Sequence, residues 1–137
     1  MKIASEKEML QFGQEFAKKH ILSKSPLIIE LIGDVGTGKT TFTRGFAAGL
    51  NINNEITSPS FNISKSYALK NGGYLIHYDF YRLKDPGIML DDLRENLQNP
   101  KNIIIVEWGE SVENLLPKNR IKINIAYNDD NSREVTL

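Results

Sequence analysis

The feature that most constrains this chain is a short glycine-rich segment between an apolar run and a helical pattern. Residues 27–32 are nearly all apolar and rich in branched side chains, which is typical of a strand covered on both faces. Residues 33–40 follow at once and read G-D-V-G-T-G-K-T, which matches G-x-x-x-x-G-K-[ST]. Average residue usage would produce that pattern in fewer than roughly 1% of random chains this long. A helix is predicted over residues 39–50, so the segment connects a buried strand to a helix N-terminus.

This arrangement predicts a phosphate-binding loop. Glycine lets the backbone approach an anion closely and point successive N–H groups at it, and three are present: Gly33, Gly36 and Gly38. The following helix adds unpaired N–H groups and the positive end of its dipole. We expect Lys39 to reach the β- and γ-phosphates, Thr40 to ligate Mg²⁺ and Thr41 to lie near the α-phosphate. The alternative is a glycine-rich turn without a ligand. Under that alternative, the lysine and the threonine would stand at the motif positions by chance.

A Mg²⁺ ion bound with a triphosphate requires a further carboxylate, usually at the end of a neighbouring buried strand. Glu107 directly follows the apolar residues 103–106, and Asp79 ends a second predicted strand. Ligands of open parallel sheets collect at the carboxyl ends of strands, which favours Glu107 as the metal carboxylate. A solvated strand end is the alternative for either residue. The hydroxyl-rich turn 57–61 is a further segment that could close on the γ-phosphate.

The remaining pattern predicts one α/β domain over residues 1–137. Ser5 and Glu8 fit a capping box for a helix over residues 5–20. Strands at 61–69 and 74–79 are joined by a turn at 71–73, and a short helix is expected near 91–98. A buried strand is predicted at 102–107 and a last hairpin runs from 121–127 back to Val135. These elements predict a three-layer sandwich around a mixed, mainly parallel sheet with antiparallel hairpins.

Composition narrows the function classes. The 17 Lys plus Arg residues equal the 17 Asp plus Glu residues, which argues against a broad basic surface for nucleic acid. Local basic patches from Lys65, Lys70, Lys118 and Arg120 stay open. The absence of cysteine excludes a disulfide framework and Cys-ligated zinc. No apolar stretch is long enough to span a bilayer, and the first residues lack the apolar core of a signal peptide, so the cytoplasm is the expected location.

Five sequence blocks in order resemble the TsaE (YjeE) family. They are residues 33–41, T-S-P-S-F at 57–61, H-Y-D-F-Y-R-L at 77–83, V-E-W-G-E at 106–110 and L-P at 116–117. The family consists of small bacterial P-loop ATPases required for making threonylcarbamoyladenosine in tRNA. The resemblance implies a mixed-sheet P-loop fold, Mg²⁺-ATP and low intrinsic hydrolysis. It also implies a partnership with the TsaB–TsaD heterodimer, in which TsaD transfers the threonylcarbamoyl group. An indirect relation to tRNA through that partner is compatible with the resemblance, and direct contact with tRNA stays open.

The resemblance also implies roles for individual residues. Phosphate binding would fall to Gly36, Thr37, Gly38, Lys39, Thr40 and Thr41. Thr40 and Glu107 would hold Mg²⁺. Asp79 would orient water or the metal shell, and Thr57 would sense the γ-phosphate. Three more residues would lie near the nucleotide: Trp108, Arg133 and, near the base, Glu6.

Other nucleotide-binding classes fit less well. The guanine-reading string N-K-x-D and the switch string D-x-x-G of GTPases are both missing from the sequence, and the chain is short for an ABC-type ATPase. A small P-loop kinase acting on a nucleoside or other small molecule is the main alternative, but Arg82 and Arg94 form no lid-like cluster. A nucleotide-dependent binding module is a third possibility. The sequence hypothesis is an ATPase that resets a tRNA-modifying complex, with slow hydrolysis in isolation because no arginine finger is evident.

Overall fold

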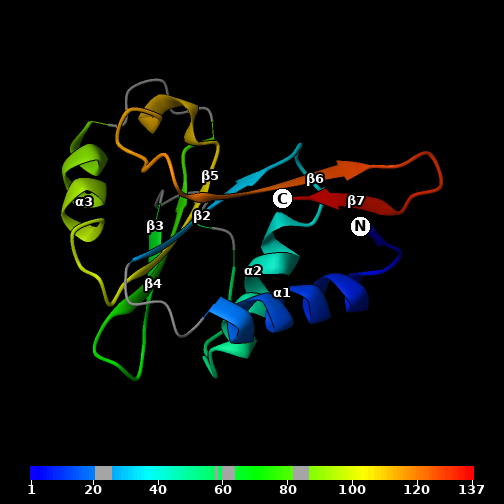
Figure 1. Ribbon diagram of the computed structural model, residues 1–137, viewed down its shortest axis with the longest axis horizontal. Coiled ribbons are helices and arrows are strands. Elements are labelled where there is room, and N and C mark those ends of the chain that lie inside the picture. Colours follow the sequence, from blue (N-terminus) through cyan, green and yellow to red (C-terminus); the bar gives the residue numbers. More distant parts are fainter. Residues whose placement is uncertain (21–25, 58, 60–63, 82–86) are drawn as a thin grey trace. The chain divides into compact units, whose positions relative to one another are not determined.

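Seven strands, three α-helices and one 3₁₀ helix form within the part of the chain that the computed structural model describes, residues 1–20, 26–57, 59, 64–81 and 87–137 (Figure 1). In chain order they are β1 (Lys2–Ile3), α1 (Glu6–His20), β2 (Leu27–Ile32), α2 (Lys39–Gly49), β3 (Ser64–Ala68), β4 (Tyr74–Asp79), α3 (Ile88–Asn96), β5 (Ile103–Glu107), η1 (Gly109–Val112), β6 (Ile121–Tyr127) and β7 (Arg133–Thr136). The sheet order is β1-β7-β6-β2-β5-β4-β3, with antiparallel edges and a parallel β4–β5 pair. The predicted α/β class with a mixed sheet is confirmed.

Most predicted elements are found within one or two residues of their expected bounds. The helix near 91–98 is the exception, because α3 begins at Ile88, directly after Gly87. Strand β1 and helix η1 were not predicted. Residues 61–63 of the strand expected at 61–69 lie outside the described residues. The capping box of α1 differs in detail, since the Glu8 N–H donates to Ser5 Oγ at 3.2 Å but the Glu8 carboxylate accepts from Ala4 N–H at 2.7 Å.

The chain divides into two compact units. The first unit comprises Met1–Leu22, Leu31–Thr57 and Lys122–Leu137, and the second comprises Ser23–Glu30 and Ser58–Ile121. Whether residues 1–137 act as one domain stays a prediction. Within the described residues, none of the helices has the length and apolar character that crossing a membrane requires.

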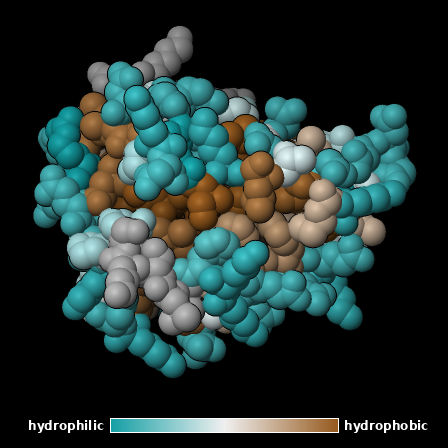
Figure 2. Space-filling model, in the orientation of Figure 1, coloured by the Kyte–Doolittle hydropathy of each residue, from teal (hydrophilic) through white to brown (hydrophobic). Residues whose placement is uncertain are grey.

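The core of the first unit lies between α1 and α2, which pack against each other and cross in the view of Figure 1. Four aromatic rings pack there with centroid distances of 5.6–6.5 Å: Phe12, Phe16, Phe42 and Phe46. In the same unit, β6 and β7 form an antiparallel hairpin, and β1 pairs with β7. The tip of this hairpin, residues 128–131, is hydrophilic (Figure 2).

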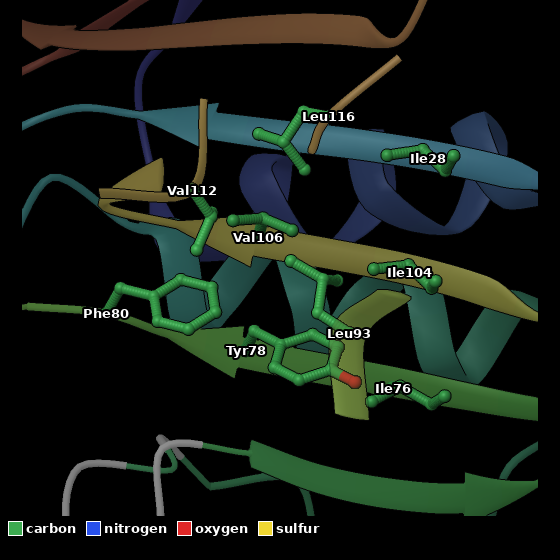
Figure 3. Close-up of a cluster of buried hydrophobic side chains, with 9 residues drawn as sticks. All are labelled: Ile28, Ile76, Tyr78, Phe80, Leu93, Ile104, Val106, Val112 and Leu116. Carbon is green, nitrogen blue, oxygen red and sulfur yellow. The ribbon is translucent and has the colours of Figure 1, made fainter. Parts of the chain in front are cut away.

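The second unit is built on the parallel pair β4 and β5, with β3 antiparallel to β4. One face of these strands packs against Leu93 of α3 and against the segment after β5 (Figure 3). The cluster comprises Ile28, Ile76, Tyr78, Phe80, Leu93, Ile104, Val106, Val112 and Leu116. On the opposite face of the strands, Leu75 and His77 of β4 and Ile105 of β5 are also fully buried. Both strands are therefore held rigidly, and their carboxyl ends are fixed side by side.

Candidate functional site

The loop at residues 33–40 lies between β2 and α2, as the sequence predicts. Two of its three glycines have a positive φ, a backbone conformation that other residues rarely adopt. Gly36 has φ +83° and Gly38 has φ +113°. Gly38 is the N-cap of α2, and no side chain caps this helix end. The N–H groups of Gly36 and Gly38 form no hydrogen bond with the part of the chain that the structure describes. Such unsatisfied N–H groups beside the positive end of a helix dipole suit an anion.

Lys39 places a cation in this loop. Its side chain is only 6% exposed, and its Nζ donates to the carbonyl oxygens of Gly33 and, at 3.3 Å, Asp34. Thr37 closes the same turn, because its Oγ1 donates to the Asp34 carbonyl oxygen at 2.9 Å. The loop is therefore ordered by its own side chains and carries a buried positive charge. Thr40 follows on α2, and its hydroxyl makes no hydrogen bond within the described residues.

A polar cavity of about 390 Å³ adjoins the loop in the first unit. Its walls include six residues that the sequence assigns to nucleotide binding: Glu6, Gly36, Thr37, Gly38, Thr41 and Arg133. Gly33, Lys39 and Thr40 belong to the same loop and helix start but do not line this cavity. The volume lies within the usual range of small-molecule sites, roughly 300–1,000 Å³. The structure therefore brings most of the predicted cofactor-binding residues together.

Among the lining residues that the sequence does not assign to the site, Arg44 and Asn131 have polar side chains with N–H groups. The Arg44 guanidinium pairs with Glu6 at 3.1 Å and donates to Thr41 Oγ1 at 3.3 Å. Arg44 is one helical turn from Thr41, so its i, i+3 spacing from the predicted site was the signal that could have identified it. The cavity thus presents a guanidinium that is already balanced by a carboxylate.

The second unit places the two predicted carboxylates on adjacent strands. Asp79 and Glu107 are register partners at the carboxyl ends of the parallel strands β4 and β5. The Glu107 side chain is buried, and its Oε2 accepts a hydrogen bond from Nε2 of the fully buried His77. Asp79 is half-buried, and its Oδ1 accepts the Tyr81 N–H at 2.9 Å. The imidazole thus fixes one carboxylate and a backbone turn fixes the other.

Trp108 follows Glu107 in a strained backbone conformation. Its φ of 55° lies in the left-handed region, which bulky side chains rarely adopt. The indole is half-buried, and its ring centroid is 4.8 Å from that of Tyr81. Such conformations cost about 1–3 kcal/mol and cluster at functional sites, so Trp108 merits its place among the candidate residues.

Several residues singled out from the sequence lie away from this cavity or outside the described part of the chain. Thr57 is exposed at the end of the first unit, and residues 58 and 60–63 of the turn 57–61 lie outside the described residues, as does Arg82. Arg94 is exposed and pairs with Asp91 at 3.1 Å. Arg120 contributes to no basic patch, because its side chain is 3% exposed and bonded to Glu30 and Glu113. Within the described residues, no group of three or more His, Asp or Glu side chains forms a metal cluster.

Comparison with known proteins identifies relatives along nearly the whole chain. A family model described as "Threonylcarbamoyl adenosine biosynthesis protein TsaE" matches residues 3–135. The tRNA threonylcarbamoyladenosine biosynthesis protein TsaE of Haemophilus influenzae is 34% identical over 137 residues, covering 98% of this chain and 85% of that protein. The protein of the same name from Bacillus subtilis is 40% identical over 113 residues, covering 80% and 68%. The crystal structure of Bacillus subtilis YdiB matches with a TM-score of 0.78 and 32% identity, covering 98% of this chain and 80% of that one.

Proposed function

Because the chain belongs to the TsaE family of tRNA threonylcarbamoyladenosine biosynthesis proteins, we propose that it binds Mg²⁺-ATP and hydrolyses it slowly to support that modification. The observation that carries the proposal is the loop of the first unit. Residues 36–39 combine two glycines at positive φ, a helix N-terminus without a side-chain cap and a buried lysine. This combination suits the β- and γ-phosphates of a nucleotide better than a neutral ligand.

The cavity beside the loop suits the rest of the nucleotide. It is polar, continuous with the glycines and Thr41, and reaches Glu6 and Arg133. In this proposal the loop amides and Lys39 bind the phosphates, while Glu6 and Arg133 lie at the nucleoside. Thr57 responds to the γ-phosphate, and Trp108 lies near the nucleotide. All of these roles follow the family resemblance. Those of the loop glycines, Glu6 and Arg133 are also supported by their shared place in the cavity wall.

The donor set also suits Mg²⁺, which prefers oxygen ligands and is commonly held by one or two carboxylates together with phosphates. Thr40 offers a hydroxyl and Glu107 a buried carboxylate that His77 holds in place. When bound, the ion would neutralise charge that develops on the phosphates. Asp79 would orient the attacking water or the metal shell. Glu107 and Asp79 are supported by their shared position at the carboxyl ends of parallel strands.

We expect Glu107→Gln to lower the rate of Mg²⁺-dependent hydrolysis by at least about tenfold. The glutamine amide keeps the shape of the side chain but lacks the negative charge that the cation requires. Turnover measured against Mg²⁺ concentration checks this. Glu110→Gln is the matched control, since Glu110 is exposed in η1. Unchanged Mg²⁺ dependence in Glu107→Gln would transfer the metal role to Asp79.

The TsaB–TsaD heterodimer is the proposed partner and the cytoplasm the proposed location. A protein that binds its partner differently with ATP and with ADP can release or reset that partner when hydrolysis occurs. No side chain in the described part of the first unit is placed as an arginine finger, since Arg44 and Arg133 already bond to Glu6 and Thr37. A partner that completes the site would therefore raise a slow basal rate.

The test measures ATP turnover by the protein alone, with TsaB–TsaD, and with TsaB–TsaD plus tRNA. Stimulation by the heterodimer supports the proposal. ATP turnover that ignores the heterodimer, together with phosphoryl transfer to a nucleoside in the absence of any partner, would instead establish the small P-loop kinase.

A further inference from the structure

The β6–β7 hairpin forms two hydrogen bonds to consecutive carbonyl groups of the phosphate loop. The phenol of Tyr127 donates to the Gly36 carbonyl oxygen. Nε of Arg133 donates to the Thr37 carbonyl oxygen at 3.0 Å. Tyr127 ends β6 and Arg133 begins β7, so both donors come from the same end of one hairpin. A strand pair far away in the sequence therefore contacts the loop at two adjacent peptide groups.

The two donors support each other. Tyr127 and Arg133 are register partners in the antiparallel pair, and the guanidinium carbon lies 4.0 Å from the centroid of the Tyr127 ring. A second guanidinium nitrogen of Arg133 donates to the Asn131 carbonyl oxygen at 2.7 Å. A cation over an aromatic face is attracted to it, so each side chain limits the movement of the other. The pair presents its two donors as one preformed unit.

The hairpin backbone also abuts the start of the loop. A Cβ atom added at Gly33 would lie 2.4 Å from the Ile125 carbonyl oxygen, so glycine is required there for close approach to β6. At Gly36 an added Cβ would lie 2.9 Å from the Tyr127 hydroxyl oxygen. Two of the three motif glycines therefore make room for the hairpin as well as for an anion.

Anchoring a carbonyl group orients the N–H group of the same peptide, because the peptide is planar and trans and the two groups point in opposite directions. The bond from Tyr127 fixes the Gly36–Thr37 peptide, whose N–H donates to Asp34 O at 3.3 Å and closes the turn, so Tyr127 acts on the shape of the loop and not on an N–H group that faces the ligand. The bond from Arg133 fixes the Thr37–Gly38 peptide, so the Gly38 N–H points away from the hairpin. An N–H group fixed before the ligand arrives binds more tightly than one that must be ordered on binding.

We propose that Tyr127 is a positioning residue that holds the phosphate loop in its polyphosphate-binding conformation through the Gly36 carbonyl group. The proposal rests on the proposed nucleotide function and assigns to Tyr127 a role that acts through the loop rather than by contact with the nucleoside. The ring of Tyr127 is half exposed and contributes little to a core, so the phenol oxygen is the part that carries this role.

The test compares Tyr127→Phe with Tyr74→Phe. The substitution at Tyr127 removes only the hydroxyl and keeps the ring on which Arg133 stacks. Tyr74 is a matched control, because it is similarly exposed (48% against 51%) and its hydroxyl makes no hydrogen bond within the described residues. Titration calorimetry measures the binding of ATP and of inorganic tripolyphosphate, which has no nucleoside.

We expect Tyr127→Phe to weaken both ligands by the same factor, roughly five- to tenfold, and Tyr74→Phe to leave both unchanged. The amide ¹⁵N resonance of Thr37 should also shift in ligand-free Tyr127→Phe, because its peptide carbonyl loses a donor. Unchanged affinities in Tyr127→Phe, or a loss confined to ATP, would overturn the positioning role. If the wild-type protein bound neither ligand, the proposed function itself would fail and this inference with it.

Discussion

Lys39→Ala is expected to weaken ATP binding roughly 10- to 100-fold and to reduce hydrolysis at least as much. The reason is that charge-assisted hydrogen bonds contribute about 1.5–3 kcal/mol each, and a buried ammonium at a phosphate site makes more than one. Lys39 is almost fully buried within the loop, so water screens its charge poorly. Calorimetric titration with ATP and a turnover assay measure the two losses.

Lys118→Ala is the control for Lys39→Ala, because Lys118 is exposed in the second unit. It removes the same net charge and should leave ATP affinity unchanged. Circular dichroism of Lys39→Ala separates lost binding from lost folding, since Lys39 Nζ also bonds to the carbonyl groups of Gly33 and Asp34. A folded Lys39→Ala protein with wild-type ATP affinity would refute the assignment of the loop.

Arg120→Met is expected to lower the free energy of unfolding by about 3–5 kcal/mol, because it leaves a buried carboxylate without its partner. Nε of Arg120 lies 2.9 Å from Glu30 Oε1, and both side chains are almost fully buried. Burial works against the charge, but the hydrogen bonds that Arg120 donates to Glu30 and Glu113 hold the pKa of Arg120 above its ordinary value, so the guanidinium stays charged. Urea unfolding of the variant measures the effect.

The double variant Glu30→Leu with Arg120→Met should recover most of that loss, since apolar residues of similar volume can replace a buried ion pair at little cost. Arg94→Met is the surface control. Its pair with Asp91 is exposed, so its removal should change stability by less than about 1 kcal/mol. Equal losses in Arg120→Met and Arg94→Met would show that burial of the Glu30 pair does not govern its contribution.

The sequence predicts local elements well where a regular pattern covers several residues. The apolar run 27–32 and the alternation at 121–127 match β2 and β6. The predicted start of α3 was three residues too late. Ile88 is 82% exposed, so no buried apolar face marks the first turn of the helix in the sequence. Strand β1 has two residues, which is too short for any periodicity.

Contacts between distant residues could not be predicted in the same way. Glu30 interrupts an apolar run, but its partner Arg120 follows 90 residues later and looks like an ordinary surface cation in the sequence. Tyr127 fits the alternation of a half-exposed strand, so nothing local marks its bond to Gly36. The motif loop is recognisable from spacing alone, whereas the side chains that hold its carbonyl groups depend on how the hairpin folds back.

Trp108 is the chain's single tryptophan, and its indole lies against Tyr81 directly after the buried Glu107. All indole fluorescence of this chain therefore originates directly after the carboxyl end of β5. A ligand that rearranges this end of the strand will change the emission, whereas events at distant surfaces will leave it unaltered. The protein thus carries its own optical reporter at one defined position, and binding kinetics can be followed without an attached dye.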